Sequence, residues 1–127
     1  MNERRLRVSA RAQMAEALVA TGIPFPGRGG DERFRAELTA MMGATAGIRR
    51  CGAAALDLAY VAAGRYDGFW ERGLSPWDLA AGIVLVREAG GLVTDLDGKE
   101  KMLATGSVLA ANDRLHASLA TLLRPAN

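Results

Sequence analysis

The sequence predicts an α/β domain in which a mixed β-sheet is layered with α-helices. Short apolar runs alternate with segments of helical periodicity along the whole chain, which is the pattern of a sheet covered by helices. Two apolar runs, at 17–20 and 108–111, are typical of central strands that are buried on both faces. The chain has 127 residues, enough for a hydrophobic core of its own, so we expect residues 1–127 to form a single domain.

Strands are predicted where apolar residues alternate with polar ones, or form a short run between turn residues. Charged and apolar residues alternate over 5–9, as in an edge strand, and aromatic residues alternate over 66–71. The other predicted strands are 17–20, 48–50, 92–96 and 108–111. Residues 22–30 contain two prolines and four glycines, so we expect a loop there.

Two helices are predicted from their boundaries. The first should be capped by Asp31 and end at Gly43 or Gly47, with apolar residues at i, i+4, i+7 and i+8 on one face. The second begins at the sequence SPWD, residues 75–78. Its serine is a preferred N-cap, its proline fits the first helical position, and its acid stands three residues after the cap. This helix should run to residue 89, before two glycines.

Two further helices complete the pattern. Residues 53–63 should form one, closed by Gly64 as the glycine that follows a helix end. Asn112 should cap the last, which carries leucines on one face and ends at Pro125.

Composition excludes several classes of protein. The net charge is +2 and the basic residues are spread out without interleaved aromatic residues, so we expect no nucleic-acid partner. The longest apolar run, 79–86, is too short to span a bilayer, and no apolar segment follows the basic N-terminus as in a signal peptide. Cys51 is the only cysteine, which fits a reducing compartment. We therefore expect a cytoplasmic protein that does not bind membranes.

Three features could carry chemistry, and each also has a structural interpretation. Asp78 either completes the helix cap or, at the helix mouth, binds a cation that bridges a phosphate. The small residues from Gly52 to Ala55 either allow close helix packing or expose backbone N–H groups to a phosphate or sugar oxygen. Glu71, at the end of an aromatic strand, either faces solvent or turns inward to accept a substrate hydroxyl.

Other polar residues favour structural roles. Asp95 and Asp97 surround a turn glycine and are expected to form that turn. Cys51 and His116 lack a third orienting group, so we do not expect a nucleophilic pair. Asp57 lies inside a predicted helix, where a hydrogen bond to the helix or a loop is expected.

Several motifs together resemble the inositol monophosphatase family. WDLAAG at 77–82, followed by EAGG at 88–91, is similar to the family's C-terminal signature. GAAALDLAYVAAG at 52–64 and YDGFWE at 66–71 are similar to its substrate-binding helix and the strand after it, and TGIPF at 21–25 resembles its T-G-F-P loop. The resemblance covers essentially the whole chain.

The resemblance implies the C-terminal subdomain of the family's α-β-α-β-α sandwich and a Mg²⁺-dependent hydrolase of inositol or sugar phosphates. It implies that Asp78 is a metal ligand that also approaches the substrate. It also implies that Gly52, Ala53 and Ala54 contact the substrate, and that Glu71 binds its ring hydroxyls. The family usually has threonine or serine at the position of Ala53, so no hydroxyl contact is expected there.

The family's other signature, D-P-x-D-G-T, which carries further metal ligands, is absent from the chain. We therefore expect a C-terminal half that is inactive alone, has no catalytic residue of its own, and hides an apolar face by forming a homodimer or by other self-association. A non-catalytic module that binds protein or RNA partners is the alternative.

Overall fold

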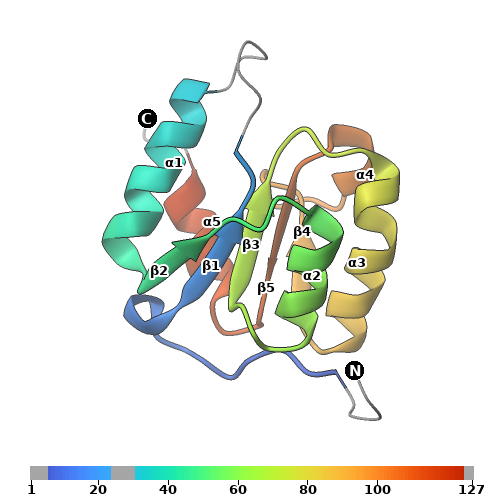
Figure 1. Cartoon of the computed structure of the whole chain (residues 1–127), viewed down its shortest axis with the longest axis horizontal. Helices are drawn as coiled ribbons and strands as arrows, with labels where there is room; N and C mark the ends of the chain where they lie inside the picture. The colour runs from blue at the N-terminus through green and yellow to red at the C-terminus, as the bar shows by residue number, and fades with distance from the viewer. Residues whose placement is uncertain (1–5, 24–30, 125–127) are drawn as a thin grey trace.

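A computed structural model describes residues 6–23 and 31–124 of the chain. It contains a five-stranded sheet between two layers of helices, which confirms the predicted fold class (Figure 1). The strands are β1 (Leu18–Thr21), β2 (Gly47–Arg49), β3 (Gly68–Glu71), β4 (Leu92–Thr94) and β5 (Val108–Ala111). The helices are η1 (Met14–Glu16), α1 (Asp31–Ala44), α2 (Ala54–Ala62), α3 (Pro76–Glu88), α4 (Met102–Thr105) and α5 (His116–Leu123).

The sheet is mixed, with strand order β2-β1-β3-β5-β4. β1 pairs in parallel with both β2 and β3, while β5 pairs antiparallel with β3 and β4. Helical crossovers join the three parallel strands, as parallel pairing requires. Their carboxyl ends therefore lie at the same edge of the sheet.

Two hydrophobic cores lie on opposite faces of the sheet, because successive strand residues point to opposite sides. In β3, Phe69 packs into the core beneath α2 and α3, and Trp70 packs into the core beneath α1 and α5. In β1, Ala20 joins the first core and Val19 joins the second. Both predicted central strands, β1 and β5, are interior strands of the sheet.

Of the two predicted N-caps that lie in the described residues, Ser75 caps its helix and Asn112 does not. Ser75 is the N-cap of α3, with proline following it. The Asn112 side chain accepts hydrogen bonds from the N–H groups of Arg114 and Leu115, at 3.1 and 2.9 Å. This caps a turn that leads into α5 rather than the helix itself. By contrast, the N-cap of α2 is Ala53, which offers no side-chain oxygen.

Some predicted boundaries were wrong. Residues 6–9 form no strand, since the N–H of Val8 bonds to the carbonyl of Ala89 at the end of α3 instead of to a neighbouring strand. β4 stops at Thr94, because the buried Asp95 side chain accepts hydrogen bonds from the backbone N–H groups of the following turn. The short helices η1 and α4 were not predicted. The Asp31 side chain, most of the loop at 22–30 and Pro125 lie outside the described residues.

A single buried acid, Asp67, holds the N-terminal segment before β1 in place. Asp67 accepts hydrogen bonds from the Ser9 hydroxyl at 2.5 Å and from the Leu18 N–H at 2.7 Å. It also pairs with Arg11 at 3.3 Å. Asn112 bonds to the same Ser9 hydroxyl, so the segment is clamped against the end of β5.

Candidate functional site

The carboxyl ends of β1, β2 and β3 bring together three segments that are distant in sequence. Gly22 follows β1, residues 50–53 follow β2, and Glu71 ends β3. α3 starts five residues after Glu71, and Asp78 lies in the first turn of this helix. Open α/β sheets bind ligands outside the carboxyl ends of their strands. This edge is therefore the candidate site.

Glu71 points into the site because of its place in β3. It lies two residues after Phe69 and therefore on the side of the sheet that α2 and α3 cover. Its carboxyl group lies directly against Gly22, where a Cβ atom would collide with it. The glycine thus makes room for the acid.

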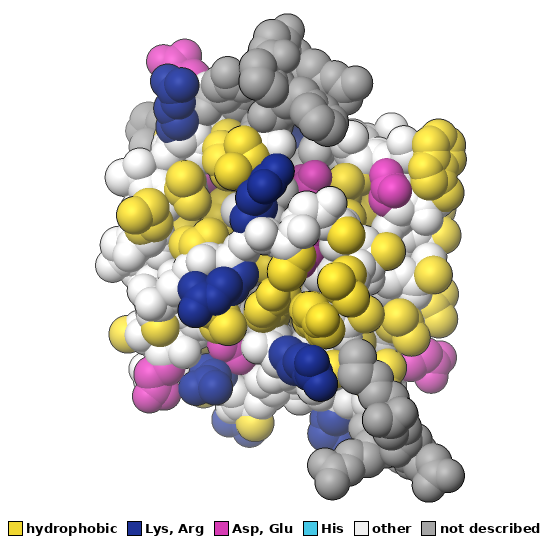
Figure 2. Space-filling model, in the orientation of Figure 1, with side chains coloured by type: hydrophobic (Ala, Val, Ile, Leu, Met, Phe, Trp, Pro, Cys, Tyr) yellow, Lys and Arg dark blue, Asp and Glu magenta, His cyan; other side chains and the backbone are white. Residues whose placement is uncertain are grey.

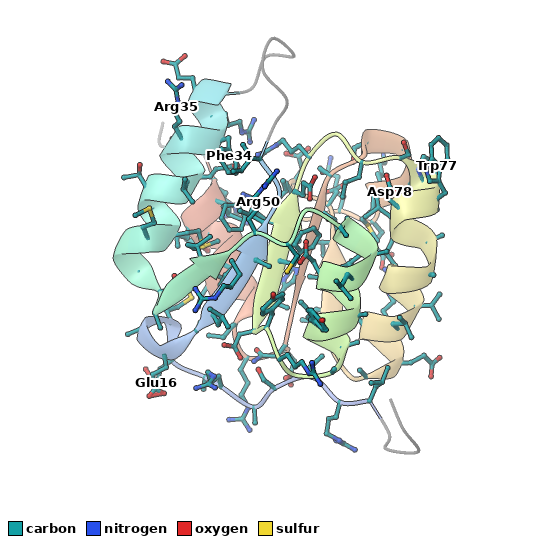
Figure 3. All side chains as sticks on the ribbon, viewed as in Figure 1. Glu16, Phe34, Arg35, Arg50, Trp77 and Asp78 are labelled. Atoms are coloured by element: carbon teal, nitrogen blue, oxygen red, sulfur yellow. The ribbon has the colours of Figure 1, made fainter. Side chains whose placement is uncertain are left out.

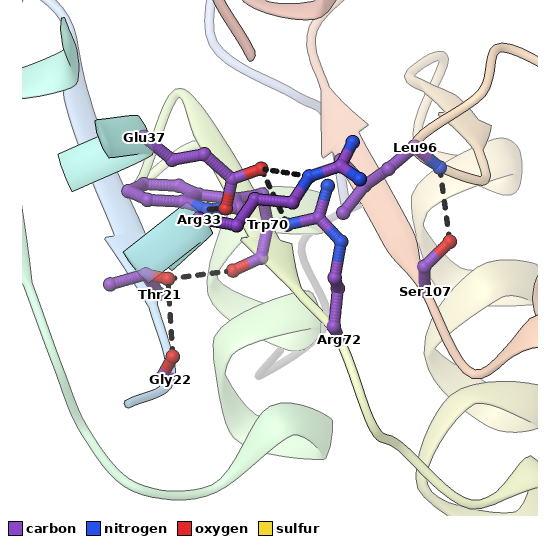
Figure 4. A network of polar contacts seen from close by, with 8 residues as sticks. All are labelled: Thr21, Gly22, Arg33, Glu37, Trp70, Arg72, Leu96 and Ser107. Carbon is purple, nitrogen blue, oxygen red and sulfur yellow. Dashed lines mark hydrogen bonds and ion pairs between the residues drawn. The ribbon is translucent and has the colours of Figure 1, made fainter. Parts of the chain in front are cut away.

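A polar network holds the end of β3 in place from the opposite side of the sheet (Figure 4). Glu37 of α1 accepts a hydrogen bond from the Trp70 indole at 3.2 Å and pairs with Arg72 and Arg33. The Thr21 hydroxyl donates to the Trp70 carbonyl at 2.8 Å. With Trp70 and Arg72 fixed toward α1, Glu71 between them is directed toward the candidate site.

Burial and neighbouring charge keep Glu71 partly protonated near neutral pH. Burial, and then the negative charges of Asp57 and Asp78, raise the pKa of Glu71 to about 7, while Arg50 opposes the shift. A carboxyl group with this pKa can both accept and donate hydrogen bonds near neutral pH. Neutral hydroxyl groups are suitable partners for such a group.

The start of α2 presents backbone rather than side chains. Gly52 has φ +82°, and no described residue other than its two chain neighbours has an atom within 4 Å of the position where a Cβ would stand. Ala53 makes no side-chain cap, so the first-turn N–H groups receive no hydrogen bond from that side chain. A helix start of this kind can bind an anion.

Asp78 lies at the mouth of α3, next to an exposed Trp77 (Figure 3). One of its carboxylate oxygens, Oδ2, accepts a hydrogen bond from the Ser75 N–H at 3.1 Å, as the capping interpretation predicts. The side chain is partly buried, belongs to none of the ion pairs among the described residues, and its charge raises the pKa of Glu71. Capping does not exclude cation binding, because a carboxylate has two oxygens.

Asp57 does not make the hydrogen bond that was expected of it. This residue of α2 is only 1% exposed, yet neither carboxylate oxygen has a hydrogen-bond partner among the described residues. Burial raises the pKa of Asp57 to about 6, and the nearby Cys51 thiol opposes this shift without a hydrogen bond of standard geometry. The expected bond to the helix or a loop is therefore absent from the described part of the chain.

Asp95, Cys51 and His116 behave as their structural interpretations predict. Asp95 is buried and accepts hydrogen bonds from the N–H groups of Asp97, Lys99 and Lys101, so it organises its turn. The imidazole of His116 bonds to Thr94 at 3.1 Å, and Cys51 contacts a different residue, Tyr66. These contacts leave no Cys–His pair.

The acids of the candidate site do not make up a complete metal centre within the described residues. No group of three or more His, Cys, Asp or Glu side chains in residues 6–23 and 31–124 is placed to hold a metal ion. Mg²⁺ bound to proteins usually has one or two carboxylate ligands together with water and substrate phosphate. Asp78 fits one such position, and the described residues do not complete the set.

No helix within residues 6–23 and 31–124 is long and apolar enough to cross a membrane.

Comparison with known proteins decides the family. Residues 1–127 match the sequence profile of the inositol monophosphatase family. The chain belongs to the inositol monophosphatase family. It is 54% identical over 119 residues to a protein of Mesorhizobium japonicum named inositol-1-monophosphatase, covering 94% of this chain and 45% of that relative. It is 51% identical over 127 residues to the Nus factor SuhB of Pseudomonas aeruginosa, covering 98% and 47%.

Solved structures of inositol monophosphatase relatives share the fold. The extragenic suppressor protein suhB of Bartonella henselae matches with a TM-score of 0.95 and 47% identity, over 99% of this chain and 49% of that one. An IMPase of Thermotoga maritima matches with a TM-score of 0.84 and 36% identity, over 96% and 46%. The chain thus spans about half the length of the relatives that it matches, and its fold is that of their C-terminal half.

Proposed function

We propose that the chain carries half of the active site of a Mg²⁺-dependent phosphate monoester hydrolase that acts on inositol or sugar phosphates. The proposal rests on one observation, the meeting of the α2 start, Glu71 and Asp78 at a single sheet edge in a member of this family. We further propose that residues 1–127 form a single domain and that this domain alone is inactive.

Each predicted residue has a role in this proposal. The backbone N–H groups of Gly52, Ala53 and Ala54 bind an oxygen of the substrate at the positive end of α2. Glu71 binds hydroxyl groups of the ring, which suits its raised pKa. Asp78 contributes its carboxylate to the metal and approaches the substrate. When bound, Mg²⁺ supplies polarisation of the phosphate and activation of a water molecule.

The isolated chain should be inactive because it offers too few carboxylate ligands for Mg²⁺. A phosphoryl-transfer site must hold its cations with several carboxylates, and Mg²⁺ gives up its hydration water reluctantly. Asp78 alone is expected to bind it weakly. The remaining carboxylates would come from a polypeptide equivalent to the half of the relatives that this chain does not match.

Phosphate release tests the proposal directly. The chain is assayed with inositol 1-phosphate and Mg²⁺, alone and after co-expression with the unmatched N-terminal half of the Mesorhizobium japonicum relative. We expect turnover only from the mixture, and its loss in Asp78→Asn. The matched control is Asp97→Asn, an exposed acid on a turn, which should leave the turnover unchanged. Turnover by the chain alone, comparable to that of a full-length relative, would refute the proposed division of the site.

An apolar surface adjoins the site. α3 buries Leu79, Ile83 and Val86 against the sheet but also exposes apolar side chains on its outer face. Figure 2 shows hydrophobic side chains gathered over α2 and α3. The outer face of α2 and α3 together has these exposed apolar residues: Ala55, Leu56, Trp77, Ala80, Ala81 and Val84. A helix that is apolar all round is normally buried on all sides.

We propose that the isolated chain covers this outer face by forming a homodimer, and that the complementary half displaces the second copy. Light scattering should give a mass that rises with concentration, and Val84→Glu should keep the chain monomeric. Met42→Glu is the matched control, because Met42 has a similar exposure but lies on α1, across the sheet. A wild-type mass that stays monomeric at all concentrations would overturn the dimer.

A second candidate function is a non-catalytic module that acts through protein or RNA partners. It is favoured by the names of some relatives, which are called Nus factor SuhB. Binding of the chain to RNA or to RNA polymerase in the presence of a metal chelator would support the module. Metal-dependent turnover by the reconstituted mixture, without such binding, would support the hydrolase.

A further inference from the structure

One buried acid of this fold differs from the others in having no cationic partner. Asp67 and Glu37 are almost fully buried, and each forms an ion pair with at least one arginine. Asp57 is only 1% exposed and belongs to none of the ion pairs among the described residues. The Cys51 thiol lowers the pKa of Asp57, but a thiol carries no positive charge. The negative charge of Asp57 is therefore not neutralised within the described part of the chain.

The fold directs Asp57 toward the candidate site. On the inner side of α2, Leu58 and Val61 pack into the same core as Phe69 of β3. Asp57 precedes Val61 by four residues, so it lies on this inner side, one turn nearer the start of the helix. Glu71 follows Phe69 by two residues, so it lies on the same face of the sheet, nearer the carboxyl edge. Both acids thus lie beyond the same end of this core.

The charge of Asp57 acts on the candidate site. Among the neighbouring acids it contributes most to raising the pKa of Glu71, ahead of Asp78. Neither Glu71 nor Asp78 belongs to an ion pair among the described residues, and Arg50, which opposes the shift, is exposed to solvent. Buried charges are screened less than exposed ones, and a site lined by charges of one sign disfavours ligands of that sign.

We propose that Asp57 is a specificity-determining residue, whose charge, added to that of Glu71, excludes substrates with a second anionic group on the ring. The inference rests on the proposed hydrolase function, because it places the substrate ring against Glu71. The charge of the reacting phosphate is balanced by Mg²⁺ and by the start of α2. A second anionic group on the ring would lie near the two acids without this compensation. The site therefore favours phosphate monoesters whose other groups are neutral hydroxyls.

The expected size of the effect follows from Coulomb's law. A unit charge several ångströms from a second one in a partly buried site changes an affinity by about tenfold. Asp57 does not need to touch the ligand to have this effect, and its burial keeps it from doing so. A neutral side chain at this position should therefore change the preference between ligands without removing a contact.

The test compares inositol 1-phosphate with inositol 1,4-bisphosphate, which differ by one phosphate. The ¹⁵N-labelled chain is assembled with the unmatched half of the Mesorhizobium japonicum relative. Each ligand is titrated at one free Mg²⁺ concentration and at about pH 8, where both acids are mostly ionised. The backbone signals of residues 52–54 and 71 give dissociation constants without any need for turnover. We expect the wild type to bind the monophosphate about tenfold more tightly, and Asp57→Asn to remove most of this preference by binding the bisphosphate more tightly.

Three variants separate this role from folding. Asp57→Asn keeps the shape of the side chain, and Asp57→Leu, which is also neutral, should change the preference equally. Both should fold, because the carboxylate that they replace has no hydrogen-bond partner among the described residues. Asp113→Asn removes the same charge at an exposed position elsewhere and should leave the preference unchanged.

Several results would overturn the proposal. These are equal binding of both ligands to the wild type, no binding of either, an unchanged preference in the two Asp57 variants, or failure of both variants to fold in thermal unfolding. A preference that disappears in these variants, together with no phosphate release from either ligand, would support the role of Asp57 and refute the hydrolase function instead.

Discussion

Replacement of Asp57 by asparagine should make the chain progressively more stable than the wild type as the pH rises. The wild-type carboxyl is buried without a hydrogen-bond donor among the described residues, so its charged form is penalised by the fold. Asparagine keeps the shape of the side chain and carries no charge at any pH. Whatever its amide costs in the same site, that cost does not vary with pH.

The magnitude follows from the pKa shift. Folding raises the pKa of Asp57 from 3.8 to about 6. The folded state therefore holds more protons than the unfolded state between these values. Stability that is present below the lower value is lost as the pH rises through the upper one. The full loss is about 3 kcal/mol, of which about 2 kcal/mol falls between about pH 4.5 and about pH 8.

Urea unfolding of both proteins at these two pH values, at one fixed concentration, measures this difference. The free energy of unfolding of the wild type should fall by about 2 kcal/mol more than that of Asp57→Asn. Removal of the Asp57 charge also lowers the pKa of Glu71, which shifts the result in the same direction. Parallel pH profiles would refute the account of a penalised buried carboxylate.

Three further substitutions test the local structure by thermal or urea unfolding. Ala53→Ser should add the N-cap bond that α2 lacks and stabilise the chain by about 1 kcal/mol. A loss instead would show that the serine cannot reach the first-turn N–H groups. Asp67→Ala should cost about 3 kcal/mol, because three donors lose their acceptor. A cost within error would mean that the N-terminal segment is not clamped. Gly82→Ala should cost about 1–3 kcal/mol, since its Cβ would collide with Leu58 where α2 and α3 cross. A neutral result would show that the two helices can separate slightly.

Sequence patterns found the features that depend on neighbouring residues. The start of α3 was predictable because the serine, the proline and Asp78 each act within one helical turn. The strand at Val108–Ala111 was predictable because its residues are apolar on both faces. The turn at Asp95 was predictable from its two acids and glycine.

The features that depend on distant residues were not predictable in the same way. Nothing in the periodicity shows that the carboxyl group of Glu71 lies against Gly22, because Gly22 follows β1 whereas Glu71 ends β3, far away in the sequence. The lack of a hydrogen-bond partner for Asp57 among the described residues likewise depends on which residues pack around α2, and these are distant in sequence. Residues 6–9 alternate like a strand, yet the N–H of Val8 bonds to the end of α3 and no strand forms.

The central claim is that the start of α2, Glu71 and Asp78 share one ligand together with Mg²⁺. Nuclear magnetic resonance of the ¹⁵N-labelled chain, assembled with the unlabelled complementary half, tests it most directly through the backbone signals of residues 52–54, 71 and 78. The account predicts that inositol 1-phosphate and Mg²⁺ shift these signals together, and that Asp78→Asn abolishes the effect of Mg²⁺. Shifts confined to other parts of the chain, or unchanged signals at this edge during turnover, would contradict it.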